Sequence, residues 1–145
     1  INIGQISGGT ADNVVPQFCE ATIDLRVKTI ADAQMMDATF KSLKSFNPDV
    51  KIEVTGGLNR PPYEETKGGR ALFDHAKLLA KSLNIDLVGV ATGGGSDGNF
   101  VAHKVPTLDG LGVDGAGAHT HNEHALVSSF VPRATLLRRL YETLS

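Results

Sequence analysis

The stretch from residue 91 to residue 124 constrains this chain most strongly, because it joins glycine turns to three histidines within six residues. It reads ATGGGSDGNFVAHKVPTLDGLGVDGAGAHTHNEH, with glycines at positions 93, 94, 95, 98, 110, 112, 115 and 117. Glycine allows positive φ and a close approach of the backbone to a ligand, but it costs entropy and buries little surface. Folding alone therefore explains these loops poorly. Imidazoles beside flexible backbone are typical of metal sites and acid–base sites.

The charge and cysteine content of the 145 residues exclude several classes of partner and site. Fourteen Lys and Arg residues stand against sixteen Asp and Glu residues without a basic run, so we expect no nucleic-acid partner. Cys19 is the single cysteine, which excludes an internal disulfide framework and a zinc site with several thiolates. No apolar run approaches the roughly 20 residues of a membrane-spanning helix, so we expect no membrane partner. Cytoplasmic and periplasmic localisation both stay open.

The first 57 residues predict a β-β-α-β unit. Residues 1–8 and 17–28 show the alternation of strands with one buried face. Residues 32–46 have apolar side chains at helical spacing, and VKIEV at 50–54 is typical of a returning strand. Two antiparallel strands, a helix and a strand are three-quarters of a split βαβ sandwich. We therefore place a first domain at residues 1–57, and we expect a longer protein because Ile1 begins inside a strand pattern.

Residues 58–145 predict a second domain, which begins with a proline-containing hinge at 58–67. The expected helices are 69–83, 97–103 and 129–144, and the expected strands are 85–90 and 105–108. Helices that alternate with strands indicate an α/β fold with a parallel sheet, in which ligands bind at the carboxyl ends of the strands. Both glycine loops follow such ends.

Two segments of this second domain are candidates for chemistry. His119, His121 and His124 could supply one or two imidazole ligands to a metal ion, or they could be surface histidines on a loop. The turn GGGSD at 93–97 could form an anion-binding nest of backbone amides, or a strand-to-helix turn in which Ser96 caps the helix. The turn lacks the GKS or GKT of a P-loop, which disfavours nucleotide phosphates.

Asn13, Arg26 and Arg60 are a third group of candidates, because each lies beside a turn or a strand end. Arginine can bind a carboxylate through two parallel hydrogen bonds, which suits recognition of an amino-acid terminus. The alternatives are solvated arginines and, for Arg26, a simple ion pair with Asp24 on the same strand face.

Four segments of the chain, in order, resemble one known family. They are GGTADNVVPQFCEATIDLR at 8–26, NRPPY at 59–63, TGGGSDGNF at 92–100 and GAGAHTHNEH at 115–124. Together they are similar to dizinc exopeptidases and deacylases, a family that includes glutamate carboxypeptidases, acetylornithine deacetylases and succinyl-diaminopimelate desuccinylases. The resemblance implies that residues 1–57 are part of a ferredoxin-like lid, which is also the dimerisation domain. It implies that residues 58–145 close a zinc-peptidase α/β catalytic domain.

The resemblance also implies roles for individual residues. His119 opens the H-[ST]-x-[ND]-E pattern of the family and matches a zinc ligand. Asn13 and Arg26 match lid positions that hold the substrate carboxylate. Gly94 and Gly95 match glycines that line the substrate pocket.

Arg60 resembles the position at which glutamate carboxypeptidases bind a C-terminal carboxylate, and the desuccinylase branch usually lacks an arginine there. It therefore favours a glutamate-carboxypeptidase-like specificity. The family's His-x-Asp motif, its bridging Asp, its remaining acidic ligand and its general-base Glu precede the lid. We therefore expect no catalytic residue in these 145 residues, and no activity from them alone.

For the complete enzyme, the resemblance implies two zinc ions and hydrolysis of an amide bond to an amino acid with a free carboxylate. The substrate would be a small peptide or an N-acyl amino acid. The implied partners are a second copy, joined through the lid, and the upstream part of its own chain. The alternatives are an N-acyl-amino-acid deacylase of the same family and a non-catalytic lid or dimerisation module.

Overall fold

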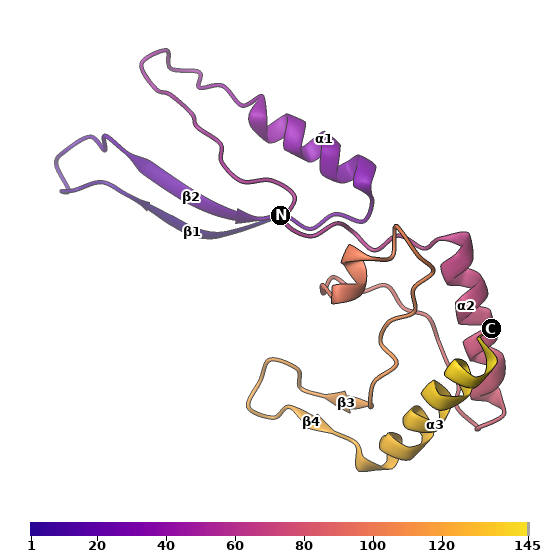
Figure 1. The fold of residues 1–145 in the computed structure, drawn as a ribbon. Helices are drawn as coiled ribbons and strands as arrows, with labels where there is room; N and C mark the ends of the chain where they lie inside the picture. Colours follow the sequence, from indigo (N-terminus) through magenta and orange to yellow (C-terminus); the bar gives the residue numbers. More distant parts are fainter. Residues whose placement is uncertain (145) are drawn as a thin grey trace. The chain divides into compact units, whose positions relative to one another are not determined.

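The computed structural model describes residues 1–144, and the chain divides after Pro62 into two units. The first unit holds a β-hairpin and one helix, and the second holds two packed helices and a short hairpin (Figure 1). The expected combination of helices and strands, an α/β fold, is confirmed. The assignment of residues 1–57 to a lid and of residues 58–145 to a catalytic domain stays a prediction.

The hairpin of the first unit pairs β1 (Asn2–Gly8) with β2 (Cys19–Asp24) in antiparallel register. Ile3 opposes Ile23 and Ile6 opposes Ala21, with a register shift between Ile3 and Gln5. One extra residue in a strand is a β-bulge, and it lets two isoleucines three positions apart share one face. The predicted strands at 1–8 and 17–28 are therefore confirmed, although the second is shorter.

Helix α1 (Ile30–Lys41) begins where the Thr29 hydroxyl accepts a hydrogen bond of 3.0 Å from the Asp32 amide. The helix ends at Lys41, earlier than the predicted end at residue 46. The Ser42 hydroxyl donates to the Thr39 carbonyl at 2.8 Å, a local bond that competes with continuation of the helix.

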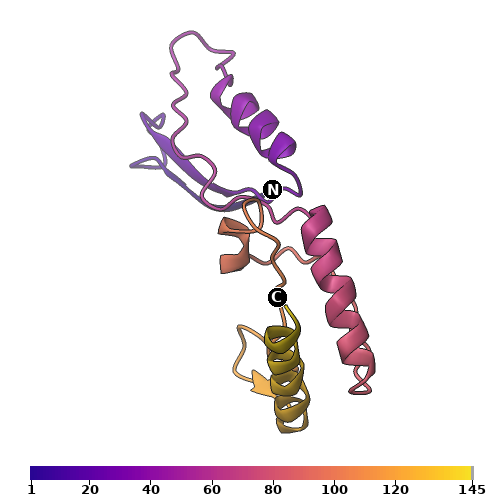
Figure 2. The same cartoon turned by 45° about the vertical axis from the view of Figure 1, so that its right-hand side comes forward.

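The predicted strand at 50–54 is wrong, because these residues form no regular secondary structure. Figures 1 and 2 show the chain after α1 running back as an irregular coil. A strand requires a ladder partner, and the apolar alternation of VKIEV does not supply one. The first unit is therefore β-β-α with an irregular return.

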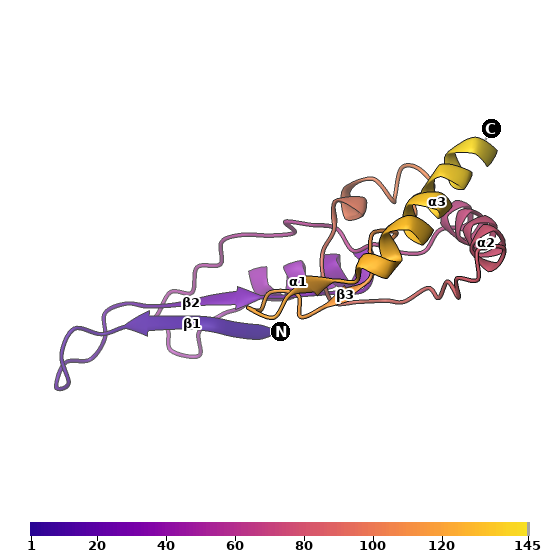
Figure 3. The same cartoon turned by 90° about the horizontal axis from the view of Figure 1, so that it is seen from below.

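The core of the second unit lies between α2 (Lys67–Lys81) and α3 (Val127–Thr143), which pack together in Figures 1 and 3. Its buried members are Ala76, Ala80, Leu87, Leu136 and Leu140. The Thr66 hydroxyl caps α2 by accepting from the Gly69 amide at 3.0 Å. The helices predicted at 69–83 and 129–144 are thus confirmed, each beginning and ending within two residues of its predicted bounds.

The strands predicted at 85–90 and 105–108 are wrong, and the described residues contain no parallel sheet. Both segments are apolar but lack a ladder partner among residues 1–144. The second unit instead has an antiparallel hairpin of β3 (Gly115–Ala116) and β4 (His124–Ala125). The helix predicted at 97–103 is reduced to the short 3-10 helix η1 (Asp97–Phe100). Within the described chain, no helix combines the length and apolarity needed to cross a bilayer.

Candidate functional site

The β3–β4 hairpin carries His119 and His121 in its loop, residues 117–123. Two of its glycines are needed for the backbone path. A Cβ on Gly115 would collide with the carbonyl oxygen of His124 across the ladder. Gly117 has a φ of 74°, and a Cβ there would lie 2.7 Å from the Asn122 carbonyl oxygen.

His119 has a φ of 66°, in the left-handed region that few non-glycine residues adopt. The turn is closed behind it by Thr120, whose amide and hydroxyl both donate to the Gly117 carbonyl, at 3.0 and 2.7 Å. The imidazole of His119 is exposed. A strained, exposed residue on a tightly closed turn suits a role in binding.

The other two histidines differ in their contacts. His124 lies in β4, and its Nδ1 is 2.8 Å from the Asn122 carbonyl oxygen. His121 is exposed in the loop. Among the described residues, no three His, Cys, Asp or Glu side chains are grouped closely enough to hold a metal ion. A stable zinc site takes about four ligands, so the metal-ligand role of His119 stays a prediction.

The turn with Gly94 and Gly95 runs into η1 through a capped end. The Ser96 hydroxyl accepts from the Gly98 amide at 2.9 Å, and the Asn99 side chain accepts from the Ser96 amide at 2.8 Å. The predicted Ser96 cap is confirmed, and two amides available to an anion nest are already bonded. A Cβ on Gly94 would meet only Thr92 Oγ1, at 3.6 Å, so packing within the described chain does not require this glycine. The pocket roles of Gly94 and Gly95 stay predictions.

The predicted carboxylate-binding residues lie in the first unit. Asn13 is exposed in the turn between β1 and β2, and Arg60 is exposed at a bend. Arg26 donates from Nε to Asp24 Oδ2 at 3.0 Å, so the predicted ion pair is confirmed. Such an exposed pair is weak and can exchange Asp24 for another carboxylate. The structure thus divides the six predicted residues between the units, with Gly94, Gly95 and His119 in the second.

Tyr63 is a polar residue near η1 that sequence analysis missed. Its hydroxyl donates to the Thr107 carbonyl at 2.6 Å, and a Cβ on Gly98 would lie 3.2 Å from its ring. Partial burial, together with the Asp109 carboxylate, raises the pKa of the Tyr63 hydroxyl above its ordinary value. No local pattern reveals a contact across 44 positions.

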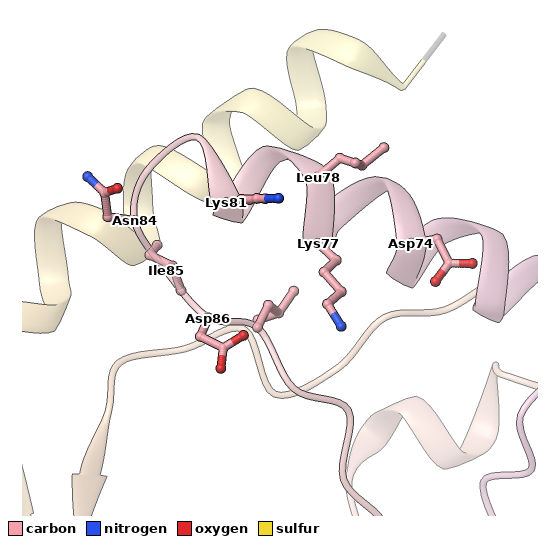
Figure 4. A pocket seen from close by; sticks show the side chains of 8 residues that line it. Asp74, Lys77, Leu78, Lys81, Asn84, Ile85 and Asp86 are labelled. Atoms are coloured by element: carbon pink, nitrogen blue, oxygen red, sulfur yellow. The ribbon is translucent and has the colours of Figure 1, made fainter.

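An open groove runs along α2 beside the segment that follows it (Figure 4). It is lined by Asp74, Lys77, Leu78, Lys81, Asn84, Ile85, Asp86 and Leu87. This lining includes none of the six predicted site residues. The groove mixes both signs of charge with exposed leucine, and it offers no convergent set of polar groups.

Comparison with known proteins gave relatives over nearly the whole chain. Succinyl-diaminopimelate desuccinylase from Psychrobacter sp. (strain PRwf-1) is 28% identical, over 99% of this chain and 37% of the relative. The enzyme of that name from Paracidovorax citrulli (strain AAC00-1) is 27% identical, over 99% of this chain and 36% of the relative. The uncharacterized protein YqjE of Bacillus subtilis (strain 168) is 30% identical, over 97% and 38%. The chain thus spans a little over a third of the length of these relatives.

The comparison with solved structures gave no significant match. A family model, by contrast, matches residues 3–143, which is nearly the full sequence. The resemblance inferred from the four sequence segments is thereby confirmed at the level of the family. The chain belongs to peptidase family M20/M25/M40.

Proposed function

We propose that the complete protein hydrolyses the amide bond of an N-acyl amino acid that carries a free carboxylate. Enzymes of this family are metal-dependent hydrolases. The observation that carries the proposal is the match of relatives named succinyl-diaminopimelate desuccinylase over 99% of this chain. Their name describes removal of an acyl group, so they favour deacylation over the glutamate-carboxypeptidase-like reaction that Arg60 suggested.

For the metal we propose two zinc ions, of which this chain contributes one ligand, His119. When bound, zinc polarises the scissile carbonyl and lowers the pKa of a bound water. The exposed imidazole on a closed turn can reach an ion whose other ligands come from outside residues 1–144. His121 and His124 are not assigned to the metal.

For the substrate we propose that Asn13, Arg26 and Arg60 bind carboxylate oxygen. Guanidinium groups match the two oxygens of a carboxylate and stay charged at every working pH. Arg26 donates from Nε to the Asp24 carboxylate at 3.0 Å, so its guanidinium already binds one carboxylate, which supports this role. Gly94 and Gly95 are proposed to line the pocket, because their segment resembles the family motif whose glycines do so.

A second candidate is an exopeptidase that releases a C-terminal amino acid, and Arg60 is the observation that favours it. A third, a non-catalytic lid or dimerisation module, is supported by the exposed apolar residues of the β1–β2 hairpin, which include Ile3 and Ile6. Under either reading the lid is proposed to join two copies of the protein.

The test is an assay of the complete, zinc-loaded protein on N-succinyl amino acids, N-acetyl amino acids and dipeptides with C-terminal glutamate. We expect the N-acyl amino acids to be hydrolysed fastest and a chelator to abolish the reaction. Preference for the dipeptides would select the second candidate. No turnover of any amide under zinc saturation would contradict the proposal.

Arg60→Ala should weaken transition-state binding of the preferred substrate by about 2–4 kcal/mol, because a charged pair is lost from a partly desolvated pocket. The measurement is kcat/KM, with Arg138→Ala as the matched control. Arg138 pairs on α3 with Glu142 at 3.4 Å and has no proposed role. Equal kcat/KM for Arg60→Ala and parent would remove Arg60 from the site.

A further inference from the structure

The β3–β4 hairpin is too short to fix its own orientation. It has two paired positions, Gly115 with Ala125 and Ala116 with His124. An isolated two-stranded hairpin is marginally stable even when it is longer. The loop with His119 therefore depends on what anchors the residues at the base of the hairpin.

Asp114, the residue before β3, is bonded through all three of its polar groups. Its carbonyl accepts from the Leu126 amide at 2.7 Å, which closes the base of the hairpin. Its amide donates to Ser129 Oγ at 2.9 Å. Its carboxylate forms an ion pair with Arg133.

Ser129 and Arg133 both belong to α3, and both are substantially buried. Ser129 is 8% exposed, and its hydroxyl also donates to the Leu126 carbonyl at 2.6 Å. The Arg133 side chain is 16% exposed. The same helix places Leu136 and Leu140 in the core, so these contacts join the hairpin to a fixed part of the unit.

We propose that Asp114, Ser129 and Arg133 are positioning residues for the metal ligand: they hold the β3–β4 hairpin, and with it His119, in the orientation that binds metal. This inference rests on the proposed metal-binding function of His119. Removing the hydrogen-bond partner of a metal ligand typically changes metal affinity about 10–100-fold, because the ligand loses its fixed direction, and we expect loss of the backbone anchor to act in the same way.

Substitutions of Arg133 can separate the effect of its positive charge from the effect of its side-chain length. Its Nη2 binds Asp114, whereas its Nη1 is buried without a hydrogen-bond partner among the described residues. Arg133→Lys keeps the positive charge and removes the unpaired group. Arg133→Met keeps the length of the apolar stem and removes the charge. We therefore expect the lysine variant, but not the methionine variant, to keep the hairpin in place.

The experiment measures zinc affinity and amide hydrogen exchange in the complete protein and its variants. In Arg133→Met and Ser129→Ala we expect the Leu126 amide to exchange at least about tenfold faster, since its anchor is lost. Zinc affinity should fall at least about tenfold in the same variants. Amides of α2 should keep their parental exchange rates. Arg133→Lys and the control Arg138→Met should match the parent in all three measurements.

Two results would overturn the inference. Parental exchange at Leu126 in Arg133→Met would show that the ion pair does not order the hairpin. Faster exchange at Leu126 with unchanged zinc affinity would show that anchoring the hairpin does not affect how His119 binds metal. If the parent itself binds no zinc, the proposed function fails, while the exchange rates still decide whether Asp114, Ser129 and Arg133 hold the hairpin.

Discussion

At the scale of single residues, the backbone of His119 distinguishes it from the other histidines. Among the described residues, only Asn84 and His119 have a positive φ without being glycine. A residue held in this region costs about 1–3 kcal/mol, which the surrounding contacts must offset. His119 therefore stands at a position where folding alone would favour glycine.

This strain leads to a prediction for His119. Relative to His119→Ala, His119→Gly should raise the free energy of unfolding by about 1 kcal/mol, because glycine adopts positive φ without a steric cost. Both variants should lose the same zinc affinity. Chemical denaturation and zinc titration measure the two effects.

The matched control is the pair His121→Gly and His121→Ala, since His121 has no positive φ. The His121→Gly variant should be no more stable than the His121→Ala variant. Equal stability of His119→Gly and His119→Ala would show that the turn carries no strain at this residue.

Tyr63 leads to a prediction about pH. The pKa of the Tyr63 hydroxyl is raised in the folded state. The protonated hydroxyl therefore stabilises the fold at every pH below its ordinary pKa of about 10. That contribution is lost as the pH rises through the folded-state pKa. Tyr63→Phe should therefore lower the free energy of unfolding by about 0.5–1.5 kcal/mol at neutral pH, through the lost bond to Thr107.

The difference between Tyr63→Phe and the parent should shrink in alkaline solution, where the parent also loses the bond. Denaturation at neutral and alkaline pH measures it. Tyr141→Phe is the control, because this tyrosine is 80% exposed. A difference that does not change with pH would contradict a stabilising role for the Tyr63 proton.

At the scale of elements, the second unit depends on the contact between α2 and α3. Leu136 is fully buried against Ala76 and Ala80. Leu136→Ala should lower the free energy of unfolding by about 2–5 kcal/mol through lost transfer energy and a cavity. Leu78→Ala on α2, where the side chain is 71% exposed, should change it by less than about 0.5 kcal/mol. Similar losses in both variants would contradict the assigned core.

The elements also show what could be predicted from the sequence. Helices α2 and α3 follow from the apolar spacing at 69–83 and 129–144. These signals are local, so a single chain segment contains them. The strands predicted at 50–54, 85–90 and 105–108 failed because a strand also needs a neighbour, which no segment encodes by itself.

The candidate site also combines features that the sequence predicts with contacts that it does not predict. The motif around His119 helped to indicate the family, because its glycines and spacing lie within one loop, while the metal-ligand role of His119 stays a prediction. The anchor from Asp114 to Ser129 and Arg133 joins residues 15 and 19 positions apart, across the start of a helix. The contact of Tyr63 with Thr107 joins residues that are 44 positions apart in the sequence. Such contacts depend on how elements pack, so residue patterns did not reveal them.

At the scale of the whole molecule, the proposed zinc site takes one ligand, His119, from the 145-residue chain. The described residues contain no group of three His, Cys, Asp or Glu side chains that could hold a metal ion. We predict that the isolated chain binds zinc weakly and hydrolyses none of the proposed substrates, because a stable site takes about four ligands. Calorimetric titration is the measurement. Tight binding of two zinc ions would contradict this prediction.

The isolated chain should associate with itself through the β1–β2 hairpin. The β1–β2 hairpin has two strands, both with an open edge, and its isoleucines at 3 and 6 are 62% and 73% exposed. Open edges and exposed apolar faces favour pairing with another chain. We expect light scattering to show self-association, which Ile6→Lys reduces because a charge on an edge strand opposes pairing. Leu78→Lys, a charge at an equally exposed leucine of α2, should leave association unchanged. A parent chain that stays monomeric at high concentration would show that the hairpin needs no partner.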